Sequence, residues 1–379
     1  MKIALCPNAF RGSLTALQAA EAMAQGLRKS RLACDPLLMP LADGGNGTLD
    51  VWLYAVQGER IQIPVRGPLG ETVLAEYGMA GKTALVEMAQ ASGVELLPLS
   101  DRNPLKTSTF GTGQLIMDAV QRGATEILVG VGGSATVDGG AGCLLALGAH
   151  LLDKNNHLIA GTGESLGQLA SIDITPLREK LAGVKIRVLC DVDNPLIGPL
   201  GAATIFGPQK GADTWAVAQL EKNLVHFAKI ARRDIGIEMG DVPRTGAAGG
   251  LSAGLNALAG AELVSGADVV IQACGYDKIL TEQGVALVIT GEGKLDDQTG
   301  GGKGPLGIAH AAARLRIPVI ALAGSVTASV ENLQAWGFAA AWSIVPRPCS
   351  LEEALKNGES WLIESATHLG NTLSIHLKI

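Results

Sequence analysis

Hydrophobic positions at the start of the chain form two short runs separated by one helical stripe. Residues 2–6 make a nearly continuous apolar run that ends at Pro-Asn, which is typical of a buried strand leaving its sheet at a turn. An apolar stripe at helical spacing follows over 17–27, after a capping box that begins at Thr15. A second apolar run at 37–41 leads into a helix that ends near Val56. This order predicts a parallel sheet covered by helices on both faces.

The pattern changes after Gly58 and changes back near residue 268. Between these points apolar and polar residues alternate around turn glycines, as in an antiparallel or mixed sheet; strands are expected within 60–67, 71–80, 82–89, 126–131 and 184–190, and helices at 112–122 and 213–233. Later strands are expected at 285–290, 317–324 and 339–346, with a helix at 305–315 and a helical tail. We therefore expect an α/β protein in which 1–57 and 268–379 form one doubly wound domain, interrupted by a mixed α/β domain over 58–267.

Composition supports two well-buried domains. The 379 residues exceed what one core usually fills, and 47% of them are hydrophobic against 17% charged. The net charge of −6 and the lack of a basic stripe argue against nucleic acid as a partner. No apolar run is long enough to span a membrane, the N-terminus shows no signal-peptide pattern, and the six cysteines have no metal or redox spacing. These features predict a cytoplasmic protein with reduced thiols.

Glycine-rich loops are the most distinctive local feature. Fifty glycines occur in the chain, and many gather in five loops at 7–13, 43–48, 132–140, 246–254 and 291–304. Doubly wound proteins bind ligands beyond the carboxyl ends of their strands, where such loops lie. Glycine lets another group approach the backbone closely, and for GVGGSATVDGG (130–140) that group is either a packed backbone or a phosphate.

Several common enzyme signatures are absent from the sequence. No loop has the Walker A spacing, and no glycine pattern is followed by the ribose-binding acid of a dinucleotide fold. Motifs of serine hydrolases and zinc proteases are also missing, and the six histidines show no clustering. What remains around the glycines is charged side chains. The cations are Arg11, Lys210, Lys294 and Lys303, and the carboxylates are Asp43, Asp138, Asp191, Glu292, Asp296 and Asp297.

This inventory favours phosphoryl transfer. Such catalysis needs backbone N–H groups and cations for the phosphates, carboxylates for Mg²⁺, and a carboxylate that orients the acceptor hydroxyl. Simpler explanations exist for some of these residues. Asp191 and Asp193 fit a turn, and Lys210 fits a solvated loop.

Nine motifs in order make the chain resemble the bacterial glycerate kinases of type I. They are PLADGGNGT (40–48), RGPLG (66–70), EMAQASG (87–93), NPLKTSTFGTG (103–113), GVGGSATVDGGAG (130–142), CDVDNPLIG (190–198), IFGPQKGA (205–212), GAAGGLSAGL (246–255) and ITGEGKLDDQTGGGKGP (289–305). The resemblance covers essentially the whole chain. It implies a two-domain α/β fold with a Rossmann-like part, and ATP-dependent phosphorylation of D-glycerate, giving 2-phosphoglycerate.

The resemblance also implies roles for particular residues. Asp191 would orient the acceptor hydroxyl, Lys210 and Lys303 would neutralise phosphate charge, and Arg11 would hold the substrate carboxylate. Mg²⁺ would bind at Glu292 and Asp296. An anion, either a nucleotide phosphate or the glycerate carboxylate, would bind near residues of the glycine loops and their neighbours: Asp43, Gly132, Gly133, Ser134, Thr136, Asp138, Gly249 and Gly250.

Five positions depart from the family pattern. Asn8 and Ala9 stand where the family usually has Asp and Ser, Asn46 replaces Glu, and Val137 replaces Asn. In the 291–304 loop, Gly302 stands where the family often has His. Loss of two carboxylates leaves two alternatives open beside glycerate kinase. One is a kinase of another small hydroxy acid, and the other is a non-catalytic ligand-binding paralogue. A monomer and a homodimer are both compatible with the sequence.

Overall fold

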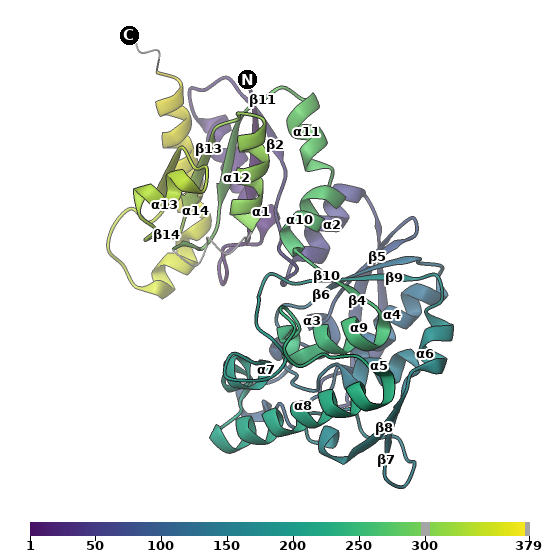
Figure 1. Cartoon of the computed structure of the whole chain (residues 1–379). Helices are drawn as coiled ribbons and strands as arrows, with labels where there is room; N and C mark the ends of the chain where they lie inside the picture. The colour runs from purple at the N-terminus through teal and green to yellow at the C-terminus, as the bar shows by residue number, and fades with distance from the viewer. Residues whose placement is uncertain (297–303, 376–379) are drawn as a thin grey trace. The chain divides into compact units, whose positions relative to one another are not determined.

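The structure is a computed structural model that describes residues 1–296 and 304–375. The chain forms two compact units (Figure 1). Unit 1 comprises residues 1–43, 50–56 and 267–379, and unit 2 comprises residues 44–49 and 57–266. The partition expected from the sequence placed 44–49 with the first part of the chain, whereas in the structure this loop packs within unit 2.

Unit 1 is built on a five-stranded parallel sheet with the order β15-β13-β11-β1-β2. Its strands are β1 (Lys2–Pro7), β2 (Asp35–Leu38), β11 (Val285–Gly291), β13 (Val319–Ala323) and β15 (Ala340–Ser343). A short parallel pair, β12 (Lys294–Leu295) and β14 (Ser325–Val326), extends beyond β11 and β13. The second strand is Asp35–Leu38 rather than the expected 37–41, although the N–H groups of Met39 and Leu41 still donate to the carbonyls of Leu5 and Pro7.

Helices cover both faces of this sheet. Alternate residues of β1 share one core with α1 and α14, while α12 contacts β1, β11 and β13 and buries a separate apolar stripe. The capping box expected at Thr15 is confirmed, since the Thr15 and Gln18 side chains each accept the other's backbone N–H. The helices of unit 1 are α1 (Ala16–Lys29), α2 (Thr48–Val56), α10 (Gly266–Ala273), α11 (Tyr276–Glu282), α12 (Gly304–Arg314), α13 (Val330–Ala335) and α14 (Leu351–Leu373).

Unit 2 contains a six-stranded mixed sheet with the order β10-β9-β6-β5-β4-β3. Its strands are β3 (Glu59–Arg66), β4 (Thr72–Ala80), β5 (Thr83–Glu87), β6 (Glu126–Gly130), β9 (Lys185–Leu189) and β10 (Glu262–Val264). The β3–β4 and β4–β5 pairs are antiparallel and the remaining pairs are parallel. The parallel and mixed sheets confirm the α/β class.

The helices of unit 2 pack around one large apolar core. They are α3 (Ala89–Ser92), α4 (Phe110–Gln121), α5 (Ala141–Leu147), α6 (Thr175–Lys180), α7 (Ala202–Phe206), α8 (Thr214–Ile235) and α9 (Leu251–Ala259), with short 3₁₀ turns between several of them. A separate hairpin of β7 (His150–Asp153) and β8 (Leu169–Asp173) lies against α8.

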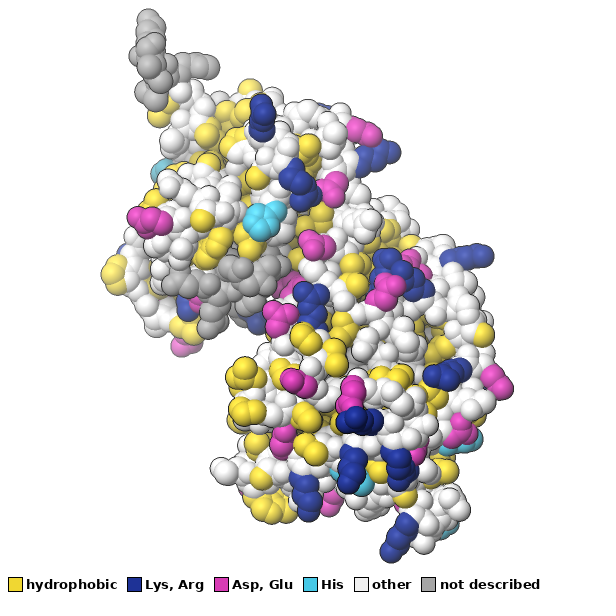
Figure 2. Space-filling view, viewed as in Figure 1, with side chains coloured by type: hydrophobic (Ala, Val, Ile, Leu, Met, Phe, Trp, Pro, Cys, Tyr) yellow, Lys and Arg dark blue, Asp and Glu magenta, His cyan; other side chains and the backbone are white. Residues whose placement is uncertain are grey.

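Charged side chains of both signs are interspersed on the face shown in Figure 2. Near the end of α8, Arg232 pairs with Glu238 and Arg233 with Asp234. Within residues 1–296 and 304–375, no helix is long and apolar enough to cross a bilayer. All six cysteines are free thiols; four are buried, and Cys34 and Cys349 are partly exposed.

Candidate functional site

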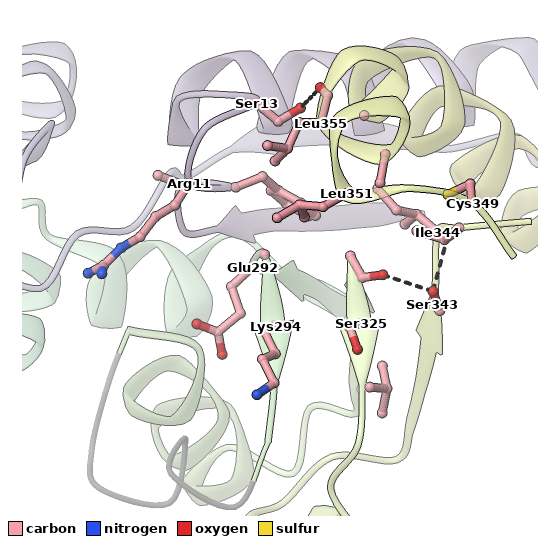
Figure 3. Close-up of a pocket in the computed structure, with 18 of the residues that line it drawn as sticks. Arg11, Ser13, Glu292, Lys294, Ser325, Ser343, Ile344, Cys349, Leu351 and Leu355 are labelled. Atoms are coloured by element: carbon pink, nitrogen blue, oxygen red, sulfur yellow. Dashed lines mark hydrogen bonds between the residues drawn. The ribbon is translucent and has the colours of Figure 1, made fainter.

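Unit 1 has a cavity of about 1040 Å³ at the carboxyl ends of its parallel strands (Figure 3). The segments that follow β1, β11, β13 and β15 all contribute to its lining. Arg11 and Asp43 line it, together with Glu292, Lys294 and Asp296. The cavity therefore gathers five of the charged residues singled out in the sequence.

A tight turn presents Arg11 at this cavity. Phe10 is 3% exposed and anchors the turn, and its carbonyl accepts the N–H groups of Ser13 and Leu14. Gly12 adopts φ +79°, a conformation that costs glycine little. Arg11 lies between these anchored residues and is exposed, with its guanidinium pointing away from α14 in Figure 3.

The segment after β11 places three charged residues on one side. Because side chains alternate along an extended chain, Glu292, Lys294 and Asp296 share a side while Leu295 is fully buried on the other. Lys294 Nζ lies 2.8 Å from an Asp296 carboxylate oxygen. Figure 3 shows Glu292 and Lys294 pointing the same way.

Asn8 contacts the carboxylate of Asp43. Its side-chain oxygen accepts the Ala9 N–H at 2.7 Å, which leaves the amide nitrogen facing Asp43 Oδ2 at 3.5 Å. An aspartate at position 8 would put two carboxylates together here, and that arrangement requires a proton or a cation. Asn8 removes this requirement.

The acidic residues of the cavity suit Mg²⁺ only together with a ligand that brings its own oxygens. Carboxylates are the protein ligands that Mg²⁺ prefers, and it is commonly held by one or two of them plus substrate phosphates. In the described part of the chain, no three His, Cys, Asp or Glu side chains converge in a metal-binding arrangement. Glu292 and Asp296 therefore fit as a partial ligand set.

In unit 2, the glycines of loop 130–140 bring backbones together. A Cβ at Gly132 would meet the α-carbon of Gly45. The Gly132 N–H donates to the carbonyl of Gly44. Gly139 packs under the ring of Phe227 and donates its N–H to Gly249. Packed backbone, rather than a phosphate, thus accounts for Gly132.

The same is true of the glycines at the start of α9. A Cβ at Gly249 would overlap the carbonyl oxygen of Thr136, and one at Gly250 would overlap the Leu196 side chain. Both glycines are buried and have positive φ. Close packing of one loop on another therefore requires glycine at both positions.

Lys210 is buried behind loop 130–140 and not solvated as a loop lysine would be. It is 2% exposed, and its ammonium donates to Ser134 Oγ and to the Thr136 carbonyl, each at 2.7 Å. Burial lowers the pKa of Lys210 to about 7, opposed by the nearby charge of Asp138. Lys210 therefore supports the loop from within.

Of the expected anion-binding residues in this loop, Gly132, Gly133 and Ser134 are at least partly exposed. Gly133 is exposed, Ser134 is partly exposed, and the Asn46 side chain lies over Gly133. Thr136 is fully buried, and its hydroxyl has no hydrogen-bond partner within the described residues. Thr136 thus cannot contact a ligand in this conformation.

Asp138 is fully buried and accepts several hydrogen bonds. Its carboxylate accepts hydrogen bonds from the Thr109 N–H and hydroxyl and from the N–H groups of Gly140 and Gly142. Burial raises its pKa, and the hydrogen bonds from Thr109 oppose that shift. The Asp138 carboxylate thus ties Thr109 to the residues at the start of α5.

Asp191 follows β9 and is partly exposed. One of its carboxylate oxygens accepts the Gly266 N–H at 3.0 Å. Its neighbour Asp193 is paired with Arg244 at the surface. Lys303 and Asp297 lie outside the described residues.

Comparison with known proteins agrees with the motifs. The model of the glycerate kinase family matches residues 3–374. The chain belongs to the glycerate kinase family. It is 47% identical to a glycerate kinase of Halalkalibacterium halodurans over 97% of each chain, and 42% identical to the glycerate 2-kinase of Escherichia coli over 100% of this chain and 99% of that protein.

A solved structure gives the same assignment. A crystal structure from Salmonella typhimurium LT2, assigned as a glycerate kinase 2, matches with a TM-score of 0.86 and 43% identity over 98% of both chains. The fold of this glycerate kinase family member is thus established over nearly its whole length.

Sequence reasoning missed the apolar part of the cavity in this glycerate kinase family member. Phe10, Ile344, Leu351 and Leu355 line it, with Ser325 and Cys349 beside them. The available signal was position, because several of these residues follow the parallel strands at their carboxyl ends. Apolar residues there look like ordinary core until the sheet is assembled.

Proposed function

We propose that this protein transfers the γ-phosphoryl group of ATP to D-glycerate, giving 2-phosphoglycerate and ADP. The observation that carries the proposal is similarity to glycerate kinases over the full length of the chain. The charged cavity of unit 1 supports it, because Arg11, Glu292 and Asp296 together supply groups that phosphoryl transfer needs.

Mg²⁺ is the metal we infer for this reaction. Glu292 and Asp296 would hold it through carboxylate oxygens, and bound Mg²⁺ would neutralise charge on the phosphates. Lys294 Nζ forms an ion pair with Asp296, and this pairing positions that carboxylate. Arg11 would make a bidentate contact with a carboxylate or phosphate.

In unit 2, Ser134 is the residue we propose for holding a substrate anion. An ammonium can only donate, so Ser134 Oγ accepts from Lys210 and its own proton is directed to another acceptor. Because Ser134 is partly exposed, that acceptor can be a ligand oxygen. Lys210 would thus act through Ser134 and not by direct contact with phosphate.

Asp191 remains our proposal for the residue that orients the acceptor hydroxyl. The Gly266 N–H fixes its carboxylate, which a positioned base requires. Asp138, Thr136, Gly132, Gly249 and Gly250 are assigned to holding the loops in place. We also propose that the two compact units are the two domains of the enzyme, with 44–49 in the second.

Release of ADP by the purified protein with ATP, Mg²⁺ and D-glycerate tests the function. Turnover of about 1–100 s⁻¹ is expected, as is usual for kinases. Phosphorus NMR of the product should show the phosphate on the 2-hydroxyl. No turnover with D-glycerate, together with turnover of another hydroxy acid, would show that the substrate assignment is wrong.

A further inference from the structure

We propose that the cavity of unit 1 is the nucleotide site of the enzyme, which leaves the glycine loops of unit 2 for the acceptor acid. This inference rests on the proposed function, since it assigns one of that reaction's two substrates to one place. The position of the cavity, its size and the distribution of its side chains support this assignment.

The cavity lies where the strand order of unit 1 reverses. From β1 the chain moves to β2 on one side, and it returns later through β11 on the other side. Ligands of open parallel sheets bind beyond the carboxyl ends of the strands at such a point. Residues 8–11 and Ser13 after β1, and residues 292–294 and Asp296 after β11, line the cavity.

Its size suits a nucleotide better than a three-carbon acid. At about 1040 Å³ the space is at the upper end of ordinary small-molecule sites, which span roughly 300–1,000 Å³. A small, strongly polar acid would leave most of it unfilled. A nucleoside with its phosphates would fill far more of this volume.

The lining divides into an apolar and a charged part. Figure 3 shows Ile344, Leu351 and Leu355 on the side of α14, with Glu292 and Lys294 pointing away from them. Apolar side chains can enclose a flat base, and cations can meet phosphates. We therefore place the base against Ile344, Leu351 and Leu355, and the phosphates toward Arg11 and Lys294.

The acidic residues make this binding dependent on Mg²⁺. Asp43, Glu292 and Asp296 line the same cavity as Arg11 and Lys294, so a bare polyphosphate would face carboxylate repulsion. A divalent cation held between the phosphates and the carboxylates removes that repulsion. We expect ADP to bind more tightly with Mg²⁺ than without it.

Cys349 provides a direct measurement in the native protein. Cys349 lines the cavity and is partly exposed. Cys34 is also partly exposed but does not line the cavity, and the other four cysteines are buried. Alkylation by iodoacetamide, followed by peptide mass spectrometry, reports each thiol separately. Saturating ADP with Mg²⁺ should slow alkylation of Cys349 by about tenfold or more, in proportion to occupancy, and leave Cys34 unchanged. D-glycerate alone should leave both rates unchanged.

A cavity-filling variant gives a second readout. Ser325 lines the cavity, so S325F should raise the KM for ATP by about tenfold or more and leave the KM for glycerate within about twofold. The matched control S325A should keep both values within about twofold.

The outcomes separate this inference from the proposed function. Turnover of glycerate with Cys349 unprotected by ADP, or protection by glycerate alone, would overturn the nucleotide assignment and leave the function intact. Protection by ADP without turnover would support the nucleotide site and contradict the function. An equal rise of both KM values in S325F would also contradict the assignment.

Discussion

Single residues in this protein are explained by what they touch rather than by their type. Asn8 stands where the family usually has Asp. Its side-chain amide donates to the Asp43 carboxylate, a contact that an aspartate carboxylate could not make. Val137, another departure, is fully buried in the apolar core of unit 2. Lys210 is the strongest case, because an ammonium with almost no exposure must be balanced by its hydrogen bonds.

Lys210 should make the free energy of unfolding increase as the pH rises above neutral. Its pKa is lowered by burial to about 7 in the folded state, whereas an unfolded chain binds the proton up to about pH 10. The unfolded state therefore holds more protons between these values, and the free energy of unfolding should rise with pH, by at most about 1.4 kcal/mol per pH unit.

Urea unfolding of the wild type and of K210M, at pH values between about 6.5 and 9.5, measures this effect. Across this range the folded protein loses the Lys210 proton while the unfolded chain largely keeps it. K210M should be less stable at high pH, because it cannot hydrogen-bond to Ser134 and Thr136, and it should lack the upward slope. Parallel slopes in the two proteins would show that Lys210 stays charged.

The carboxylates after β11 give a prediction about metal dependence. If Glu292 helps to hold Mg²⁺, E292Q should need about tenfold or more Mg²⁺ for half-maximal rate, because an amide is a poorer ligand than a carboxylate. The steady-state rate is measured against free Mg²⁺ at fixed ATP. E352Q, at an exposed position in the first turn of α14, is the matched control and should behave as the wild type. An unchanged Mg²⁺ dependence of E292Q would remove Glu292 from the ligand set.

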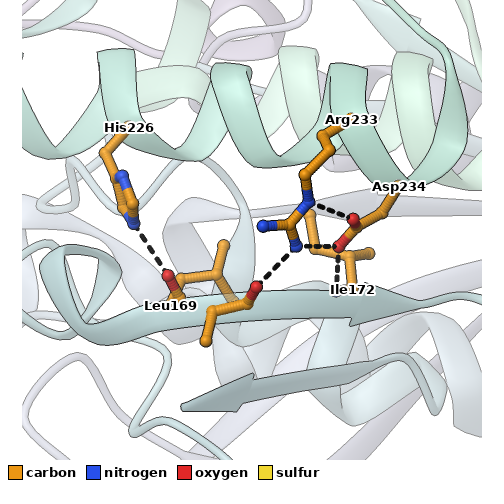
Figure 4. A network of polar contacts seen from close by, with 6 residues as sticks. Leu169, Ile172, His226, Arg233 and Asp234 are labelled. Atoms are coloured by element: carbon orange, nitrogen blue, oxygen red, sulfur yellow. Dashed lines mark hydrogen bonds and ion pairs between the residues drawn. The ribbon is translucent and has the colours of Figure 1, made fainter. Parts of the chain in front are cut away.

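At the scale of elements, helix α8 secures the β7–β8 hairpin through side chains (Figure 4). Asp234 accepts the Ile172 N–H at 2.9 Å, Arg233 donates to the Ala170 carbonyl, and a His226 ring nitrogen lies 2.7 Å from the Leu169 carbonyl. An isolated two-stranded hairpin is marginal in water, and each of its strands has one edge whose backbone groups have no strand partner. These contacts satisfy several of those groups on β8.

Removing the Asp234 carboxylate should therefore cost more than a surface ion pair does. D234A leaves the Ile172 N–H and the Arg233 guanidinium without this partner, and we expect a loss of about 1–2 kcal/mol in the free energy of unfolding. The control R232A breaks the exposed pair with Glu238 and should cost less than about 1 kcal/mol. Equal losses in chemical denaturation would mean that Asp234 acts only as a surface charge.

At the scale of the whole molecule, unit 2 is held together by interlocking glycine loops from distant parts of the sequence. Loop 44–49 packs on loop 130–133 through Gly44 and Gly45, and loop 246–250 packs on residues 136–139. Gly44 also lies against Leu189 at the end of β9. Side chains at these glycines would hold the backbones apart.

G249A and G183A separate packing from backbone conformation. Both glycines have positive φ, so each substitution should cost about 1 kcal/mol from the backbone alone. A Cβ at Gly183 meets open space, whereas one at Gly249 overlaps Thr136, so G249A should lose at least about 2 kcal/mol more. Thermal unfolding of the two variants measures the difference. Equal losses would show that the loops can move apart freely.

The sequence alone determined most strands of the two main sheets and the chemical class of this protein, but it did not predict β10 or the β7–β8 hairpin. Apolar periodicity and the Thr15 capping box predicted strands and helices, because these patterns depend on residues only a few positions apart. Nine motifs in order indicated the glycerate kinase family, which the comparisons then showed. Three of the expected glycine loops, within 8–13, 43–47 and 132–140, are loops in the structure, whereas residues 251–254 of a fourth begin helix α9.

Only the tertiary structure decided what those loops contact. It brought Arg11 and Glu292 to one cavity with Ile344 and Leu355, and it buried Lys210, Thr136 and Asp138 behind loop 130–140. A glycine that approaches a phosphate and one that approaches another backbone have the same local sequence, since both need only an absent side chain. Which partner fills that space depends on how two sheets order their strands, and this is a property of contacts between residues far apart in the chain.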